Sequence, residues 1–298
     1  MNALALSPDF EARVRRQEPM SRHTSWRVGG PAEVFFTPKD ADELARFIRG
    51  LDADTPVLWI GLGSNLLVRD GGIRGAVIDT HGVFAELERL GDEEVYCGSG
   101  VACAKLAKQC VKWGLGPAEF FAGIPGTLGG ALAMIAGAFG GETWTHVISV
   151  ETLDRQGVRR ERSASDYSVG YRRVQGPADE WFLGARLRFE PRPGVSNDDI
   201  RVLLARRKAT QPIGEWSCGS VFTNPPGDHA ARLIESCGLK GFRIGGARVS
   251  EMHANFIVND GTATAADIER LIAHVMRTVK EQHGIELKPE VRMVGEAQ

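Results

Sequence analysis

Apolar residues recur along the chain with two spacings, one typical of helices and the other of strands. The clearest helical repeat starts at Thr264 and Asp267 and ends at Gly284. A second helix is predicted after Asp40, because Glu43 follows it with the spacing of a capping box. The apolar faces of these two helices are Ile268, Leu271, Ile272, Val275, Met276 and Val279 in the first, and Leu44, Phe47, Ile48 and Leu51 in the second.

The same periodicity predicts three further helices. One covers residues 103–113 and ends at Gly114, one covers residues 198–209, and one is capped by Asp228 and stops at Gly238. The helix at 198–209 is expected to bury Ile200, Leu203 and Leu204. Short apolar runs predict strands at residues 32–36, 57–60, 66–68, 147–153, 181–189, 253–259 and 287–292. The elements group into three lobes, at residues 21–80, 81–194 and 195–298.

Residues 119–140 break both patterns, since no charged residue occurs from Phe120 to Gly141 and glycines are frequent. A solvated loop would hold polar residues, and glycine together with Pro125 disfavours an ordinary helix. One interpretation is backbone that lies against a flat ligand, where a Cβ would collide. The other is a segment of small residues at which two core elements pack closely.

A glycine turn, Gly61-Leu62-Gly63-Ser64-Asn65, connects two of the predicted strands. Backbone N–H groups in such a turn can form an anion-binding nest. The dinucleotide-binding fingerprint would need a following helix and a third spaced glycine, and both are missing, so a Rossmann site is excluded. A tight hairpin without a ligand is the alternative.

Two other polar stretches could carry chemistry. Arg172 follows Tyr167, Gly170 and Tyr171, and could clamp an anion or be a surface arginine at a strand end. Ser220 follows a glycine but has no nearby histidine and no Gly-x-Ser-x-Gly context, so a serine hydrolase is disfavoured.

Composition limits the class of protein. The 298 residues are 43% hydrophobic and 25% charged, as in a soluble globular enzyme, and the net charge of −2 gives no electrostatic case for nucleic acid. No apolar run approaches a membrane span, and residues 1–10 do not resemble a signal peptide. The five cysteines form no Cys-x-x-Cys pair. We therefore expect buried thiols in the cytoplasm, with neither disulfides nor a metal site.

Several short motifs occur in a characteristic order, from the glycine turn at 61–65 through the glycine-rich segment at 123–131 to the tail. In this order the chain resembles, along nearly its whole length, the flavin-dependent UDP-N-acetylenolpyruvoylglucosamine reductases of bacterial cell-wall synthesis. The interval 173–211 is short, so the chain is most similar to the form that lacks a substrate-covering insertion. The motifs are Thr24 with Gly29-Gly30-Pro31-Ala32, Gly61-Leu62-Gly63-Ser64-Asn65-Leu66-Leu67-Val68, Gly123 to Ala131, Ala136-Gly137-Ala138, Tyr171-Arg172, Gly219-Ser220-Val221-Phe222 with Asn224-Pro225, His253-Ala254-Asn255-Phe256 and Pro289-Glu290-Val291.

The resemblance implies an α+β fold of the vanillyl-alcohol-oxidase type. Two α+β subdomains, residues 21–80 and 81–194, would bind one FAD non-covalently, and an α+β substrate domain would cover residues 195–298. The turn at 61–65 would hold the pyrophosphate, and the later glycines would lie along the pyrophosphate and the flavin. The cofactor-binding residues implied are Gly61, Leu62, Gly63, Ser64, Asn65, Gly123, Ile124, Pro125, Gly126, Thr127, Gly129, Gly130, Ala131, Ala136, Gly137 and Ala138.

The resemblance also implies a two-step reaction in a shared pocket. NADPH reduces the flavin, and flavin N5 then passes hydride to the vinyl methylene carbon of the enolpyruvyl sugar nucleotide. Ser220 matches the proton donor, and Arg172 and Glu290 match the residues that handle the substrate carboxylate. A second negative charge there is unfavourable, so Glu290 is expected to be protonated and to donate a hydrogen bond. The substrate-binding residues implied are Tyr171, Arg172, Gly219, Ser220 and Asn224.

This chain departs from the family at two positions. Ile135 replaces an asparagine, and Thr223 replaces a basic residue whose role Arg232 or Lys240 could take. Two alternatives remain: a flavin-dependent alcohol or sugar oxidase of the same fold, and a flavoprotein or sugar-nucleotide binder without turnover. The expected partners are the enolpyruvyl sugar nucleotide and NADPH. The protein is expected to be a monomer that binds neither nucleic acid nor a membrane.

Overall fold

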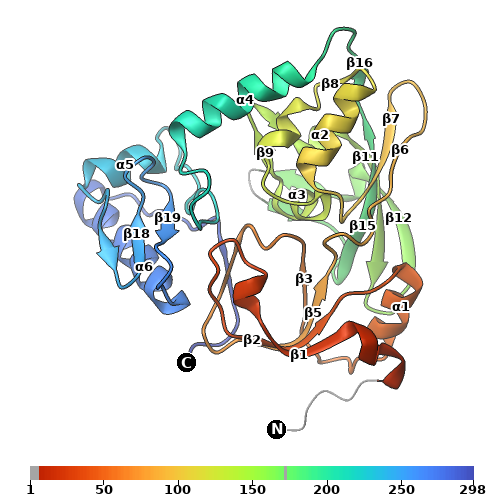
Figure 1. The fold of residues 1–298 in the computed structure, drawn as a ribbon, viewed down its shortest axis with the longest axis horizontal. Coiled ribbons are helices and arrows are strands. Elements are labelled where there is room, and N and C mark those ends of the chain that lie inside the picture. The colour runs from red at the N-terminus through yellow and green to blue at the C-terminus, as the bar shows by residue number, and fades with distance from the viewer. Residues whose placement is uncertain (1–6, 171–172) are drawn as a thin grey trace. The chain divides into compact units, whose positions relative to one another are not determined.

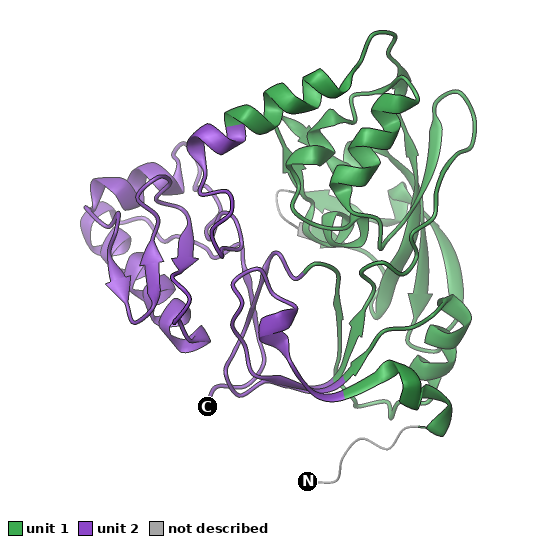
Figure 2. Cartoon of the chain, in the orientation of Figure 1, with its two compact units in different colours: residues 1–15, 35–62, 76–206 green, residues 16–34, 63–75, 207–298 purple. Residues whose placement is uncertain are grey.

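The chain forms two compact units in a computed structural model that describes residues 7–170 and 173–298 (Figure 2). Unit 1 contains the chain up to Arg15, Phe35–Leu62 and Ala76–Arg206, and unit 2 contains Arg16–Val34, Gly63–Gly75 and Arg207–Gln298. The chain therefore crosses from one unit to the other several times before residue 80. The division into three domains at 21–80, 81–194 and 195–298 stays a prediction.

An antiparallel sheet with the strand order β12-β11-β15-β7-β6 is the centre of unit 1 (Figure 1). In the register of its middle strands, Val150 lies opposite Ala185, which lies opposite Cys97. These three side chains are buried in the core. The bounds are β6 Leu87–Arg89, β7 Glu94–Gly98, β11 Val147–Asp154, β12 Arg159–Ser163 and β15 Glu180–Arg188.

Two helices pack on this sheet, α2 (Cys103–Lys112) and α3 (Leu128–Met134). The apolar residues of α2 repeat at intervals of three and four, which puts them all on one face of the helix. That face joins the sheet residues in one hydrophobic core, as the sequence predicts. The buried residues of α2 are Cys103, Leu106, Ala107, Cys110 and Val111.

A smaller sheet has the order β1-β2-β5-β3, with β3 parallel to β5. Helix α1 (Ala41–Arg49) belongs to unit 1, and the Asp40 carboxylate caps it by accepting the Glu43 N–H at 2.8 Å. Phe47 of this helix stacks on Phe36 with the ring centroids 3.9 Å apart. The strands are β1 Val14–Pro19, β2 Pro31–Phe36, β3 Val57–Ile60 and β5 Ile73–Asp79, of which β1 and β5 were not predicted.

Unit 2 combines a three-stranded antiparallel sheet, β17-β18-β19, with helices α5 and α6. Thr264 and Asp267 form the capping box of α6, and the helix ends at Gly284, as predicted. Strand β4 pairs in parallel with β20 near the end of the chain. The bounds are β4 Leu66–Val68, α5 Ala230–Ser236, β17 Arg243–Ile244, β18 Ala247–Val249, β19 Ile257–Asn259, α6 Ala265–His283 and β20 Arg292–Val294.

Apart from helix α4 (Asn197–Thr210), the remaining elements are short. They are 3-10 helices at Pro8–Arg13, Met20–Arg22, Glu119–Gly123, Thr143–His146 and Ala164–Asp166, together with six strands of two or three residues. The strands are β8 Leu115–Gly116, β9 Gly137–Ala138, β10 Gly141–Glu142, β13 Ser168–Gly170, β14 Arg173–Gln175 and β16 Glu190–Pro191.

Several predicted elements are wrong in extent. The strand predicted at 253–259 is a turn followed by β19, because the Asn255 N–H donates to the His253 ring and the Asn255 side chain accepts the distant Phe222 N–H. The tail becomes strand β20 only at Arg292, since residues 289–290 instead make isolated bonds to residues 221–222. Asp228 does not cap α5, because the first amide of that helix donates to Asn224.

Helix α4 (Asn197–Thr210) forms where it was predicted but buries less than expected. Ile200 is its one fully buried residue, and Leu204 is 38% exposed. The sequence suggested a stripe of Ile200, Leu203 and Leu204, but the charged residues of α4 surround that stripe and leave most of the helix in solvent.

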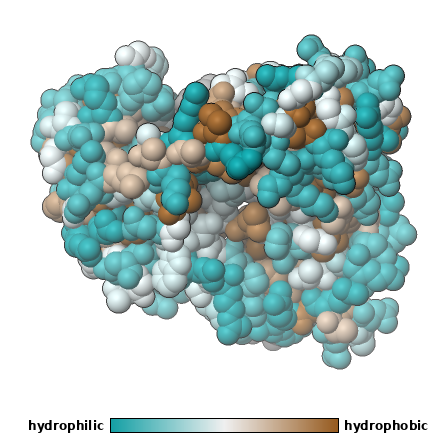
Figure 3. All heavy atoms as spheres, turned by 45° about the horizontal axis from the view of Figure 1, so that its top comes forward, coloured by the Kyte–Doolittle hydropathy of each residue, from teal (hydrophilic) through white to brown (hydrophobic). Residues whose placement is uncertain are grey.

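All five cysteines have free thiols, and all but the half-buried Cys237 are buried. Burial raises the pKa of Cys103 and Cys110 to about 12, which makes their thiolates scarce at neutral pH. None of the helices in the described ranges combines the length and apolar character needed to cross a bilayer. Hydrophilic residues cover most of the face drawn in Figure 3.

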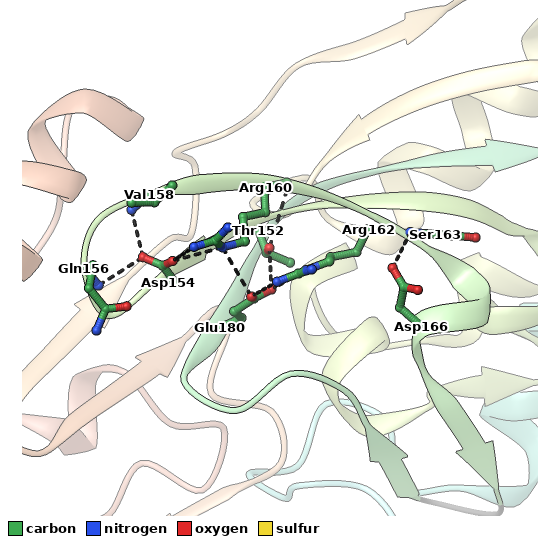
Figure 4. A network of polar contacts seen from close by, with 9 residues as sticks. All are labelled: Thr152, Asp154, Gln156, Val158, Arg160, Arg162, Ser163, Asp166 and Glu180. Carbon is green, nitrogen blue, oxygen red and sulfur yellow. Dashed lines mark hydrogen bonds and ion pairs between the residues drawn. The ribbon is translucent and has the colours of Figure 1, made fainter.

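A network of ion pairs covers the end of the large sheet where β11, β12 and β15 meet (Figure 4). Arg160 donates to Asp154 at 2.8 and 3.0 Å and approaches Glu180 at 3.7 Å. Glu180 also accepts from Arg162 and, at 2.8 Å, from the Thr152 hydroxyl. The two carboxylates are buried beneath the arginines, so their charges are well satisfied.

These partners hold the pKa values of both carboxyl groups below their ordinary values. For Glu180 the main cause is the hydrogen bond from Arg162. For Asp154, burial raises the pKa, but the N–H of Val158 and the guanidinium of Arg160 outweigh it. A depressed pKa stabilises the fold above the ordinary value of the group, and this contribution is lost as the pH falls through the folded value.

Glu180→Gln is therefore expected to lower the free energy of unfolding at pH 7 by about 1–3 kcal/mol. The difference from the unaltered protein should begin to shrink below the ordinary pKa of 4.5 and vanish below the lowered folded value, where both proteins carry a neutral side chain. Denaturant unfolding at pH 7 and in acid measures this. Glu88→Gln, at an exposed glutamate of β6, is the control and should change stability by less than about 0.5 kcal/mol. A loss that is independent of pH would contradict the electrostatic account.

Candidate functional site

The glycine turn after β3 begins in unit 1 with Gly61, which lies against Thr127. A Cβ at Gly61 would collide with the Thr127 hydroxyl oxygen. That oxygen is fully buried and has no hydrogen-bond partner among the described residues. The first glycine of the turn is therefore required by the close approach of the segment that begins α3.

The turn continues in unit 2 with Gly63, whose φ of +58° lies in the left-handed region. A Cβ there would run into the backbone carbonyl of His23, and the Gly63 carbonyl accepts the Ser25 N–H at 3.2 Å. The hairpin alternative is wrong, because β3 pairs with β5 and β4 pairs with β20. A glycine turn between strands of two different sheets is consistent with the predicted anion nest.

The second glycine-rich segment contains a helix, contrary to the sequence expectation. Helix α3 runs from Leu128 to Met134, and its first turn is held by the neighbouring loop. The Leu128 N–H donates to Val101, and the Gly129 N–H donates to Ser99, each at 2.9 Å. Tertiary contacts therefore outweigh the poor helix propensity of glycine.

Close internal packing and a ligand-facing backbone, the two interpretations of this segment, each fit some of its glycines. A Cβ at Gly123 would collide with Phe139 and Ala138, and one at Gly141 would collide with Phe120. These glycines are explained by close internal packing. Gly130 is different, because the nearest atom to a Cβ there is the Thr127 hydroxyl at 3.9 Å. Its glycine leaves open space beside the buried hydroxyl, as a ligand-facing position would.

The end of α3 carries unusual backbone strain. Ile135 adopts φ 48° and ψ 52°, a left-handed conformation that a β-branched residue rarely takes, and it is 2% exposed. This conformation costs about 1–2 kcal/mol for an L-residue with a Cβ, and asparagine tolerates it better. The next residue, Ala136, donates its N–H to Ala131 and accepts from Thr143, so its backbone is used within the protein. Gly137 and Ala138 form β9.

In unit 2 the structure brings Ser220 and Glu290 onto neighbouring segments. The Glu290 N–H donates to the Val221 carbonyl at 2.7 Å, and Phe222 forms a β-bridge with Pro289. Ser220 is partly exposed, and no group in residues 7–170 or 173–298 hydrogen-bonds its hydroxyl. The serine and the glutamate predicted from the sequence, 70 residues apart in the chain, therefore lie on segments that hydrogen-bond to each other.

Two asparagine side chains hold these segments, and sequence analysis assigned neither to this task. Asn255, 4% exposed, accepts the Phe222 N–H at 2.9 Å and donates to the Phe222 carbonyl at 2.8 Å. Asn65 donates its side-chain amide to the Glu290 carbonyl at 3.1 Å. The signal for Asn255 was its place in the motif at 253–256.

Tyr171 and Arg172 lie outside the described residues, so the anion clamp stays a prediction. Asn224 accepts the N–H of the first residue of α5, which is a capping role. The two cations proposed to replace a basic residue at 223 already have partners. Arg232 pairs with Asp228, and Lys240 pairs with Glu235 at 2.7 Å.

Comparison with known proteins is consistent with this arrangement. A family model for an FAD-binding domain matches residues 32–161. A second family model, described as the C-terminal domain of UDP-N-acetylenolpyruvoylglucosamine reductase, matches residues 211–294. The α+β flavin-binding fold expected from the sequence is confirmed.

Proteins named UDP-N-acetylenolpyruvoylglucosamine reductase match almost the whole chain. The protein from Alkalilimnicola ehrlichii is 59% identical over 96% of each chain, and that from Methylococcus capsulatus is 57% identical over 94% of this chain and 93% of its own. The crystal structure of the enzyme so named from Thermus caldophilus superposes with a TM-score of 0.80, at 34% identity, over 94% of this chain and 98% of that one. The chain therefore belongs to the UDP-N-acetylenolpyruvoylglucosamine reductase family.

Proposed function

We infer that the protein is an FAD-dependent oxidoreductase that uses NADPH to reduce the enolpyruvyl group of UDP-N-acetylenolpyruvoylglucosamine, in peptidoglycan synthesis. The observation that carries this inference is the combination of two glycine-lined segments with a serine and a glutamate held together in unit 2. Full-length relatives that carry the reductase name support the substrate.

The residues of the glycine segments fit FAD. Thr127 is 1% exposed, and its buried hydroxyl has no hydrogen-bond partner among the described residues. Buried hydroxyls are nearly always hydrogen-bonded. A phosphate oxygen at this place would supply the missing acceptor. Gly130 leaves room beside the Thr127 hydroxyl, so a ligand can approach the backbone there. Bound there, FAD would supply the redox chemistry of the reduction, as the hydride donor.

The chain's own residues supply binding and the proton. The Ser220 hydroxyl donates a proton to the carbon beside the substrate carboxylate while hydride reaches the methylene carbon. A hydroxyl is a weak acid, so it needs a strongly basic acceptor and a fixed position. Glu290 binds the substrate carboxylate from the neighbouring segment. Arg172 adds the planar bidentate contact that guanidinium makes with carboxylates.

We further propose that the protein acts as a monomer in the cytoplasm. Five free cysteines are consistent with a reducing compartment, where NADPH is also available. Gly219 and Tyr171 complete the proposed substrate contacts. Asn224 would contact the substrate only through its side-chain NH₂, because its side-chain oxygen accepts the first N–H of α5.

The product tests the proposal. Incubation of the holoprotein with NADPH and UDP-N-acetylenolpyruvoylglucosamine without oxygen should yield a sugar nucleotide heavier by two hydrogen atoms, with one NADPH consumed per product. Mass spectrometry and the absorbance of NADPH measure both. Consumption of NADPH that requires oxygen and leaves the sugar nucleotide unchanged would favour an oxidase, and no consumption at all would favour a binding protein.

A further inference from the structure

We propose that Asn255 is a positioning residue for the reaction, because it fixes the segment of Ser220 against the segment of Glu290. This inference rests on the proposed roles of Ser220 and Glu290. Asn65 holds the opposite side of the pair through the Glu290 carbonyl. The two asparagines thus bond the backbone of the two segments that carry Ser220 and Glu290.

Asn255 makes three hydrogen bonds to the two residues that follow Ser220. Its backbone carbonyl accepts the Val221 N–H at 2.9 Å. Its side chain bonds both the N–H and the carbonyl of Phe222, as a neighbouring strand would. Val221 and Phe222 are also buried. The backbone immediately after the proposed proton donor therefore has little freedom to rotate.

The segment after Ser220 is also bonded on its other side, by the tail of the chain. The Val221 carbonyl accepts the Glu290 N–H, and the Thr223 N–H donates to the Lys288 carbonyl at 3.0 Å. Asn65 then bonds the Glu290 carbonyl, and the carbonyl of Asn65 accepts the Arg292 N–H at 3.0 Å. Glu290 is thus held from both directions along its backbone.

Asparagine suits this place because its amide offers a donor and an acceptor at once. An alanine at 255 would leave the buried N–H and carbonyl of Phe222 without partners, at a cost of about 1–3 kcal/mol for each group. The segment would relax to recover these bonds and would move the Ser220 hydroxyl. A displacement of about 1 Å can slow a positioned reaction by roughly 100-fold.

The chain offers a matched control in Asn259, which is also buried and also bonds backbone. Its side chain donates to the Trp26 carbonyl at 2.7 Å and accepts from Gly261 at 2.8 Å and Ala263 at 3.0 Å. None of these partners belongs to the segments of Ser220 or Glu290. Asn259→Ala should therefore lower stability by a similar amount without moving the reacting groups.

The test compares Asn255→Ala with Asn259→Ala in the holoprotein. We expect Asn255→Ala to slow oxidation of the reduced flavin by the enolpyruvyl substrate by about 10- to 100-fold, with flavin reduction by NADPH changed less than about twofold. Hydrogen exchange at the amides of residues 221–222 should accelerate at least tenfold or so in Asn255→Ala alone. Asn259→Ala should leave both half-reactions and this exchange unchanged.

Equal rates in both half-reactions for the two variants, or unchanged exchange at 221–222, would overturn the proposal. If Asn255→Ala does not fold, Asn255→Asp keeps the acceptor for the Phe222 N–H and loses the donor, and Asn65→Ala, at a less buried position, tests the Glu290 side. Ser220→Ala distinguishes a failure of the proton-donor role of Ser220 from a failure of the positioning role of Asn255. If it leaves the substrate half-reaction intact, the role of Ser220 is wrong. If it abolishes that step and the asparagine variants do not slow it, only the positioning role fails.

Discussion

Ser220→Ala is expected to slow the reduction of the enolpyruvyl substrate by about 10²- to 10⁴-fold, the usual contribution of a positioned general acid. The reason is that no described group bonds the Ser220 hydroxyl, which leaves it available to the substrate, while the backbone that carries it is fixed on both sides. Flavin reduction by NADPH should continue at the normal rate, because no proton from Ser220 is needed there. Anaerobic stopped-flow absorbance of each half-reaction measures both effects.

Ser236→Ala is the matched control, since its hydroxyl bonds the Leu233 carbonyl within α5 and lies outside the proposed site. It should leave both half-reactions unchanged. Ser220→Cys should recover part of the lost rate, because a thiol can also donate a proton. Equal loss in the two half-reactions of Ser220→Ala would mean that the substitution damages the flavin site, and the proton-donor role would then be wrong.

Gly63→Ala is expected to destabilise the protein by about 3 kcal/mol or more and to weaken FAD binding. Overpacking alone costs roughly 1–3 kcal/mol, and a left-handed conformation adds about 1–2 kcal/mol for a residue with a Cβ. At this position the Cβ would meet the His23 carbonyl, which is backbone and cannot swing aside as a side chain would. Denaturant unfolding of the apoprotein and titration with FAD measure the two effects.

Gly238→Ala is the control that measures the cost of the left-handed backbone conformation alone. Gly238 has φ +70°, and a Cβ there would have no atom within 4 Å. It should lose only about 1–2 kcal/mol and bind FAD normally. If Gly63→Ala and Gly238→Ala lowered the free energy of unfolding equally, the close approach of the His23 carbonyl would not be the reason that position 63 requires glycine.

The sequence was sufficient to predict elements whose stabilising contacts are local. Helix α6 follows from its 3.6-residue repeat and its capping box, and α1 follows from Asp40 and the stripe that includes Phe47. The meeting of Ser220 and Glu290 was predicted only through resemblance to a family. No local pattern shows that residues 221 and 290 will share a hydrogen bond.

The errors occur where distant contacts outweigh local preference. Helix α3 forms across Gly129 and Gly130 because Val101 and Ser99 accept its first amide groups. The strand predicted at 253–259 is interrupted because the Asn255 side chain bonds Phe222, 33 residues away. The hairpin alternative at 61–65 fails for the same reason, since strand β4 finds its partner in the tail.

The most direct test of the whole account is the visible spectrum of the purified protein under nitrogen. The solution should be yellow from bound FAD, lose its colour when NADPH is added, and regain it when UDP-N-acetylenolpyruvoylglucosamine follows. A colourless preparation that takes up no flavin would contradict the cofactor site. Colour that returns only when oxygen is admitted would contradict the reductase activity.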